Sequence, residues 1–319
     1  MGETKLITPQ WSIETIFSRP LHGREIGFVD KPFQHPEGLD EAVRASWDQQ
    51  CDEKVADMEK EGKPGQVQPY HKDKSPNPWS AVYDGTGKVA LFPGSVLSIR
   101  DVVTHDDGEV DVHVGQVLFP MIKAVQRPEV QAQYQDAGLE IPSPATGLYS
   151  FLWTMDGDLI MNVRGDTKVW AYQGRLYGAG GNPTDPNESL QEHQIQELQD
   201  EMLLKPEQFD PDDIKFIGIV HDQDLNPGKP DIVSWAPINM TTREFVRQFY
   251  DTPQEQRQPD SIGLVAVNNN SSTGLRNYLL QQSHPRQFCP PTAAGLVLTG
   301  HHMYGPEWAE SVTQNLQRM

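Results

Sequence analysis

The sequence predicts an α/β protein, α+β in the order of its elements, in which a mixed sheet is flanked by helices. Short apolar segments separated by an Asp-Gly turn, as in residues 149–163, have the pattern of paired strands. Residues 188–204 instead carry Ile195, Leu198 and Met202 at helical spacing, so that they share one side of a helix. A helix with one apolar side needs a sheet or another helix to cover that side.

Composition limits the class of protein. The chain has 319 residues, a formal net charge of −19 and 36% hydrophobic residues. This length predicts two domains, or one elaborated domain, with a packed core. The negative charge argues against nucleic acid or an anionic membrane as a partner. A polyphosphate substrate would therefore need metal ions or a local basic patch in order to approach.

The cysteines and the N-terminal residues indicate a cytoplasmic protein with no membrane segment. Cys51 and Cys289 are far apart in the sequence and form no metal or redox motif, and so few cysteines fit a reducing compartment. Apolar runs stay short of the about 18 residues that a membrane span requires. The first residues lack the basic and apolar segments of a secretory signal.

Residues 1–145 are predicted to form an accessory domain that shapes the substrate site, and residues 146–319 a second domain. A helix is expected from Asp40 to about Gly62, with Val43, Trp47 and Cys51 at helical spacing. A helix that faces the core explains this stripe most simply, and an interface in a homodimer or between domains is the alternative. Residues before about 38 are expected to be extended.

Turn and strand signals divide the rest of the chain. Residues 63–77 are polar and contain three prolines, which favours a loop. A hairpin is expected around Asp107-Gly108, and Pro142 and Pro144 mark the domain boundary. Further strands are expected at residues 149–154, 159–163, 169–172, 214–220, 232–238 and 262–267, and further helices at about 127–140, 242–250, 274–282 and 291–299.

Three basic residues cluster in sequence just before the glycine-rich segment. Arg164, Lys168 and Arg175 lie close together in a chain that is short of positive charge. Binding of substrate phosphate is one explanation of this cluster. Ordinary solvation of a protein surface explains it equally well.

The stretch from Gly180 to Leu204 places carboxylates after a loop of glycines and prolines. Glu197, Asp200 and Glu201 stand at positions i, i+3 and i+4, so they share one face of a helix. Like charges at this spacing repel by a few tenths of a kcal/mol per pair, and a bound cation would reverse that repulsion. Hard oxygen ligands suit Mg²⁺ or Mn²⁺. A solvated acidic face is the alternative in a chain this acidic.

These residues resemble a Nudix box, the loop-helix signature of hydrolases that cleave nucleoside diphosphates linked to another group. The family pattern is Gly, five residues, Glu, seven residues, then Arg-Glu-apolar-any-Glu-Glu-any-Gly-apolar. The matching positions in this sequence are Glu188, Glu197, Leu198, Asp200, Glu201 and Leu204.

The chain departs from the pattern at three places. The first glycine position falls on Asn182, with Gly181 one residue early, the arginine position is Gln196, and the last glycine position is Leu203. The carboxylates of the box are thus kept, whereas the arginine that orients them is replaced by a neutral side chain.

The resemblance implies a Nudix-like α/β/α sandwich and a metal-dependent hydrolase acting on a small nucleotide-type molecule such as a nucleotide sugar. Glu197, Asp200 and Glu201 are the implied metal ligands, with Glu197, Glu201 and Glu188 as the implied catalytic residues. The family varies in which carboxylate deprotonates the attacking water. Glu201 or an acid of the 221–230 loop are both candidates here. A Nudix-fold protein that binds a nucleotide derivative without cleaving it is the alternative.

Overall fold

Period-two alternation of apolar residues builds the central sheet. In β9 (Gly147–Trp153), Leu148 and Leu152 face one side and Tyr149 and Phe151 the other. The computed structural model describes residues 6–60, 62–72, 75–87, 89–91, 93–165, 172–253, 256–257, 261–268, 271–281 and 287–318.

The central sheet is mixed, because β14 and β9 are parallel whereas β13 pairs antiparallel with both β2 and β14. β12 (Ala179–Gly181) also pairs with β9, and β15 (Ser261–Asn268) with β10. The remaining strands lie in the order β1 (Leu6–Ile7), β2 (Trp11–His22), β13 (Lys215–Asp222), β14 (Lys229–Pro237), β9, β10 (Asp158–Arg164) and β11 (Leu176–Tyr177).

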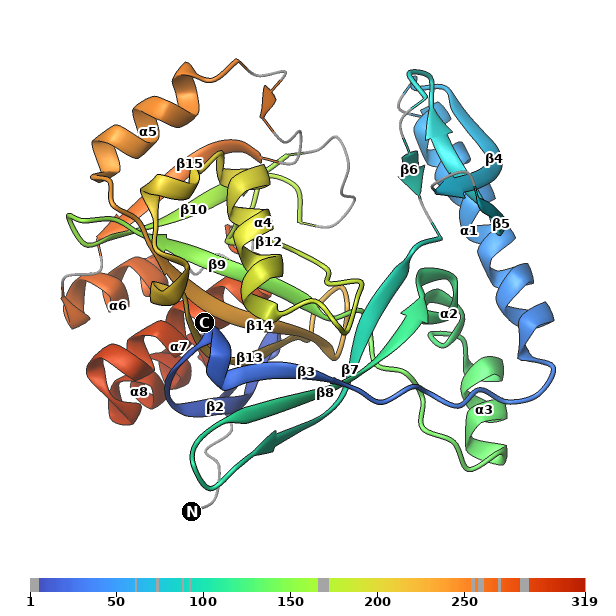
Figure 1. The fold of residues 1–319 in the computed structure, drawn as a ribbon, viewed down its shortest axis with the longest axis horizontal. Coiled ribbons are helices and arrows are strands. Elements are labelled where there is room, and N and C mark those ends of the chain that lie inside the picture. Colours follow the sequence, from blue (N-terminus) through green and yellow to red (C-terminus); the bar gives the residue numbers. More distant parts are fainter. Residues whose placement is uncertain are drawn as a thin grey trace.

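Helices cover both faces of this sheet and make an α/β/α sandwich (Figure 1). On one side lie α4 (Leu190–Met202) and α5 (Thr242–Asp251). On the opposite side lie α6 (Ser272–Gln281), α7 (Pro290–Tyr304) and α8 (Pro306–Gln317). The predicted fold class is therefore confirmed. Among the described helices, none has the length and apolar character to cross a membrane.

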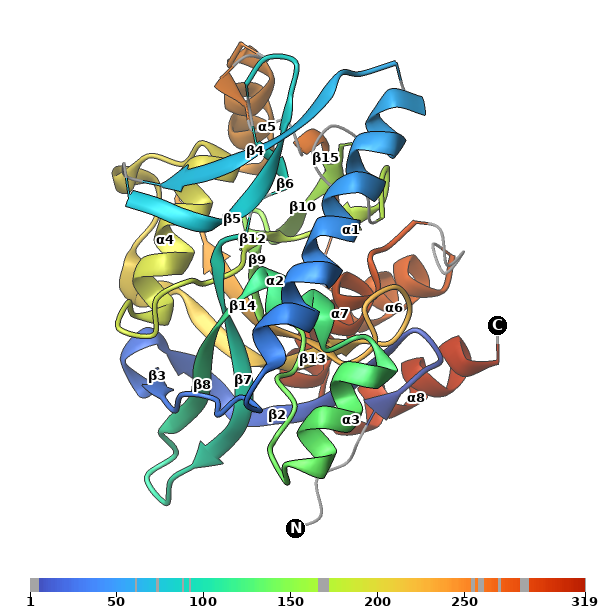
Figure 2. The ribbon, with the colours of Figure 1, turned by 90° about the vertical axis from the view of Figure 1, so that its right-hand side faces the viewer.

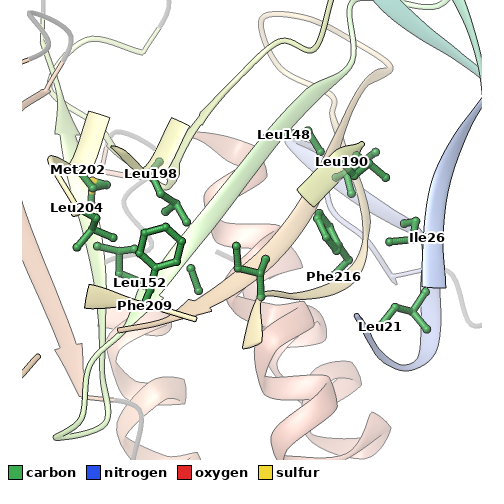
Figure 3. Close-up of a cluster of buried hydrophobic side chains, with 14 of the residues drawn as sticks. Leu21, Ile26, Leu148, Leu152, Leu190, Leu198, Met202, Leu204, Phe209 and Phe216 are labelled. Carbon is green, nitrogen blue, oxygen red and sulfur yellow. The ribbon is translucent and has the colours of Figure 1, made fainter. Parts of the chain in front are cut away.

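Helix α4 docks through the apolar side that its sequence predicts. Leu198 and Met202 are fully buried and Ile195 packs partly buried against the same cluster. Figure 3 shows Leu198 and Met202 beside Leu152, and Leu190 near Leu148. The expected strands at residues 149–154, 159–163, 214–220, 232–238 and 262–267 correspond to β9, β10, β13, β14 and β15.

The N-terminal segments form two smaller sheets and a helical lobe. The long helix α1 (Leu39–Lys60) packs along β4 (Gly65–Lys72) and β5 (Ser75–Asp84) (Figure 2). Its residues Val43, Trp47 and Cys51 are buried, as the core-facing interpretation predicts. The elements are β3 (Ile26–Asp30), α1 (Leu39–Lys60), β4 (Gly65–Lys72), β5 (Ser75–Asp84), β6 (Val89–Leu91), β7 (Ser95–Thr104), β8 (Val110–Leu118), α2 (Phe119–Ala124) and α3 (Pro128–Asp136).

Strands from both sides of residue 145 meet in the central sheet. β2, which lies in the first 22 residues, pairs with β13, and Phe17 and Leu21 belong to the same core cluster as Leu198. β1 and β2 thus extend the sheet formed by residues 147–268, from which the predicted boundary separates them. A division into domains at residue 145 stays a prediction.

One local prediction is wrong, one helix was not predicted, and one predicted strand falls mostly outside the described residues. The segment 63–77 is not a loop, since β4 and β5 run through it, with β4 at the edge of its sheet, where proline is tolerated. Helix α8 was not expected. Of the predicted strand 169–172 only Tyr172 is described, and it lies in a bend with a positive φ of 61°.

Candidate functional site

The box helix α4 begins at a capping box. The Ser189 hydroxyl accepts from the Glu192 backbone N–H at 3.0 Å, and the Glu192 carboxylate accepts from the Ser189 backbone N–H at 3.1 Å. These two bonds satisfy backbone donors that the first turn of a helix leaves free. They place the end of the glycine-rich loop and Glu188 directly before the helix.

Helix α4 directs two of the three predicted metal ligands towards the glycine loop. Glu197 is half-buried and Glu201 is only 6% exposed. Asp200 is exposed. Neighbouring residues of a helix point about 100° apart, so Glu201 faces the protein while Asp200 faces solvent. His193, Glu197 and Glu201 stand at successive i+4 positions and form one line along the helix.

The glycine loop touches both inward-facing carboxylates. The Gly180 backbone N–H donates to Glu201 Oε2 at 2.8 Å. A Cβ at Gly181 would lie 2.7 Å from the carboxyl carbon of Glu197, and a Cβ at Gly180 would lie 2.6 Å from the Tyr149 Cα. Neither position has room for a side chain, because at both the loop passes too close to a neighbour.

His193 lies between the first and second glutamates of the box. Its Nδ1 is 3.6 Å from Glu188 Oε2 and its Nε2 is 3.5 Å from Glu197 Oε1. The side chain is buried, and Nε2 has no hydrogen-bond partner. Burial lowers the pKa of His193, and this effect outweighs the opposing effect of Glu188.

A cavity of about 240 Å³ opens beside the glycine loop. We call the surface formed by Gly178, Gly180, Gly181 and Glu201, together with Glu197 behind Gly181, the box wall. We call the surface formed by Tyr172, Asp222, Lys229 and Asp231 the hairpin wall, because the last three lie at the ends of the β13–β14 hairpin. Helix α2 borders the same cavity through Phe119 and Lys123.

The hairpin wall is a buried network of charged and phenolic groups. Asp222 is 1% exposed and accepts from the Tyr172 hydroxyl at 2.7 Å and from the Asp224 backbone N–H at 2.8 Å. Burial raises the pKa of Asp222, and these hydrogen bonds oppose that rise. Lys229 donates to Asp231, whose second carboxylate oxygen is buried without a hydrogen-bond partner.

Charge in the cavity differs from charge in the whole chain. Lys123, Arg164 and Lys229 contribute three positive charges to the lining, against the three acids Glu201, Asp222 and Asp231. The chain as a whole carries 26 basic and 45 acidic residues. The cavity is therefore locally balanced and can accept an anion that the remaining surface repels.

The predicted basic cluster is only partly assembled. Arg164 lines the cavity, with its guanidinium 5.1 Å from the centre of the Tyr177 ring. Arg175 lies over the Tyr172 ring at 4.7 Å, and its Nη1 is 3.8 Å from Asp224 Oδ2. Lys168 lies outside the described residues. Of the cluster, Arg164 is the residue that the structure brings to the cavity.

Sequence reasoning did not find Lys123, Lys229 or Asp231, and found Asp222 only as a possible base. Asp222 and Lys229 are opposite each other in the β13–β14 register, and Asp231 is opposite Gly147 of β9. Such pairings depend on the register between strands that are distant in sequence, so no local motif predicts them. Cys289 also lines the cavity, but burial raises its pKa to about 11, which keeps the thiol protonated at neutral pH.

The residues of the box wall fit a divalent cation of the Mg²⁺ type. Glu197 and Glu201 present hard oxygen ligands one helical turn apart, and Gly181 leaves the space beside Glu197 that a Cβ would fill. Within the described ranges no group of three or more His, Cys, Asp or Glu side chains is placed to hold a metal ion. Mg²⁺ is commonly held by one or two carboxylates together with substrate phosphates and water, so two ligands suffice.

Comparison with solved structures finds Nudix-type hydrolases. An ADP compounds hydrolase is 12% identical and covers 76% of this chain and 94% of its own, with a TM-score of 0.35. A Bacillus subtilis pyrophosphohydrolase is 10% identical (48% and 77% covered, TM-score 0.31), and the MutT protein of Methanosarcina mazei is 14% identical (54% and 92%, TM-score 0.29). No family model and no curated protein matches the sequence. All of these TM-scores are below 0.5, so the likenesses carry no argument about this chain, and the Nudix-like fold stays an expectation from the box.

Proposed function

We propose that this protein is a metal-dependent hydrolase that cleaves a diphosphate bond in a nucleoside diphosphate linked to another moiety, for example a sugar. The observation that carries the proposal is that the box wall meets a cavity whose lining includes three basic side chains. Glu197 and Glu201 lie against the glycine loop, and Lys123, Arg164 and Lys229 line the space beside them. Carboxylates for a cation and cations for a phosphate are the two requirements of diphosphate hydrolysis.

The proposal gives each residue one task. Glu197 and Glu201 hold Mg²⁺ or Mn²⁺, which when bound neutralises the diphosphate and stabilises the charge that develops on the leaving oxygen. Lys123, Arg164 and Lys229 bind and orient the phosphate groups. Lys168 and Arg175 are kept as further phosphate-binding candidates.

Glu201 is the proposed base for the attacking water, with Asp222 of the hairpin wall as the alternative. Both line the cavity, whereas Glu197 lies against Gly181. The Gly180 N–H fixes Glu201 Oε2, so the carboxylate is held in one orientation for proton transfer. Glu188 supports the loop from outside the cavity.

The second candidate function is binding of a nucleotide derivative without cleavage. The exposure of Asp200 favours it, because this removes one of the three implied metal ligands from the cavity side of α4. The neutral Gln196 at the arginine position points the same way. The two functions differ in one measurable property, which is turnover.

The test is a screen of nucleotide sugars, dinucleotides and ADP-ribose with Mg²⁺ or Mn²⁺, coupled to phosphatase and phosphate detection. Glu201→Gln keeps an acceptor for the Gly180 N–H and removes one charge. We expect it to lower turnover by at least about 100-fold while leaving the unfolding temperature of the apo protein unchanged within a few degrees.

Glu207→Gln, an exposed acid just after α4, is the matched control and should leave turnover unchanged. Asp200→Asn tests the role of Asp200. If it lowers turnover as much as Glu201→Gln does, Asp200 is a metal ligand. Stabilisation of the wild type by Mn²⁺ without hydrolysis of any substrate would favour the binder. Hydrolysis that survives in Glu201→Gln would move the base to Asp222.

A further inference from the structure

The acids of the box have an uncharged neighbour where a fixed cation is expected. Helix α4, described over its whole length, contains Glu192, Glu197, Asp200 and Glu201 but neither lysine nor arginine. Gln196 is exposed. Helix α4 therefore supplies no lysine or arginine that could orient the carboxylates of Glu188 and Glu197.

His193 has the position for this task. It stands one turn before Glu197 on the same face of α4, and one turn after Ser189, whose carbonyl accepts from its backbone N–H at 3.0 Å. The imidazole therefore lies over the junction between loop and helix. Its two nitrogens approach Glu188 Oε2 and Glu197 Oε1 at 3.6 and 3.5 Å.

The surroundings of His193 leave its ring little freedom. The side chain is 8% exposed, and the neighbouring Gln194 is fully buried, with Nε2 3.4 Å from the Ala179 carbonyl. On the far side, the Glu197 carboxylate is confined by Gly181, where even a Cβ would not fit. Glu197 thus lies between the imidazole and the backbone of the loop.

We propose that His193 is the positioning residue of this site, because its ring lies between Glu188 and Glu197 and holds the Glu197 carboxylate in the orientation that receives a divalent cation. This inference rests on the proposed cation-binding role of Glu197. Without the ring, Glu197 can rotate about its side-chain bonds, and the contact that supports the ligand is lost. Loss of such outer support typically weakens metal affinity 10- to 100-fold.

The experiment measures Mn²⁺ binding to the full chain by titration with electron paramagnetic resonance, in the absence of substrate. His193→Leu removes both nitrogens at similar volume, and His193→Gln keeps one donor. We expect the Kd for Mn²⁺ to rise at least about 10-fold in His193→Leu, with partial recovery in His193→Gln.

Gln194→Met is the matched control, because Gln194 is equally buried, lies next along the helix and contacts the Ala179 carbonyl rather than Glu188 or Glu197. It should change the Kd less than threefold. Thermal unfolding reports whether each variant folds. If His193→Leu does not fold, the Mn²⁺ affinity of His193→Gln tests the inference instead.

Equal effects of His193→Leu and Gln194→Met would overturn the inference, because they would indicate a merely structural role. Unchanged Mn²⁺ affinity in both His193 variants would overturn it as well. The proposed function can fail separately from the inference. If Mn²⁺ binding depends on His193 but no diphosphate is hydrolysed, the inference is supported and the proposed hydrolase activity is contradicted. A wild type that does not bind Mn²⁺ overturns both.

Discussion

The two walls of the cavity hold their carboxylates in different ways. On the box wall, Glu201 is fixed by a backbone N–H and Glu197 lies against a glycine. On the hairpin wall, Asp222 is held by a tyrosine hydroxyl and Asp231 by a lysine. The backbone donor that contacts Glu201 brings no formal charge, whereas the Lys229 ammonium that contacts Asp231 carries a full positive charge.

This difference suggests a division of labour. The acids of the box wall are arranged for an added cation, which would relieve their mutual repulsion. The acids of the hairpin wall already have partners within the protein, Tyr172 for Asp222 and Lys229 for Asp231, so we expect their first contribution to be to the stability of the β13–β14 hairpin and of its contact with Gly147. Three variants test this division.

The glycine pair of the box wall should give the largest effect. In Gly180→Ala the new Cβ meets the backbone of β9, which cannot move without displacing a central strand. We expect a loss of about 3 kcal/mol in the free energy of unfolding, measured in urea. In Gly181→Ala the Cβ meets only the end of the Glu197 side chain. That variant should lose less than about 1 kcal/mol but bind Mn²⁺ at least about 10-fold more weakly.

If Gly180→Ala and Gly181→Ala destabilise the protein equally, Gly181 has the same structural role as Gly180 and no separate role in cation binding. Retained Mn²⁺ affinity in Gly181→Ala would indicate that the contact between Gly181 and Glu197 has no part in the site.

The hairpin wall should respond in stability rather than in cation binding. In Asp231→Asn, Lys229 loses its charged partner in a site where its side chain is only 23% exposed. We expect a loss of about 2 kcal/mol in urea unfolding, which is below the about 3–5 kcal/mol of a fully buried pair because the Lys229 side chain is partly exposed to solvent. Mn²⁺ affinity should stay within about threefold of the wild type.

Asp224→Asn is the matched control in the same hairpin. Asp224 is exposed and lies 3.8 Å from Arg175, so its removal should cost less than about 0.5 kcal/mol. If Asp231→Asn instead abolishes Mn²⁺ binding at unchanged stability, the cation site spans both walls.

The same contrast explains what the sequence could predict. Helix α4, its capping and its buried Leu198 and Met202 follow from spacing within a short stretch. The hairpin wall follows from register between strands that are distant in sequence, which no local pattern specifies. Lys123 reaches the cavity from α2, so its role depends on how that helix packs, which is equally hidden from local reasoning.

Two details within the box itself also escaped prediction. Glu197, Asp200 and Glu201 were grouped on one face, but the docked helix sends Asp200 to solvent, because the depth of docking decides which edge of a face is covered. Gly181 stands one residue before the glycine position of the pattern, and its close contact with Glu197 shows why a residue without a side chain is required there. His193 carried no signal, since one histidine on a helix is usually part of the core.

The smallest effect is expected where the helix of the box wall ends. Leu203, at the position where the box pattern has glycine, is the C-cap of α4 and has a positive φ of 57°. The left-handed conformation is about 1–2 kcal/mol less favourable for a residue with a Cβ, and glycine adopts it freely. Leu203 therefore adopts the left-handed backbone conformation that favours glycine, although the residue at this position is not glycine.

Leu203→Gly should consequently stabilise the protein. Relief of backbone strain is partly offset by the lost burial of a half-buried leucine and by the larger entropy of glycine in the unfolded chain, which leaves a gain of about 0.5 kcal/mol. Urea unfolding of wild type and Leu203→Gly measures it, with Leu203→Ala as control, since alanine loses the contacts but keeps the strain and should destabilise. Because Leu203 lies beyond Glu201 and Met202 at the far end of the helix from His193, Mn²⁺ affinity should not change. A weaker affinity in Leu203→Gly would mean that the strained cap itself positions Glu201.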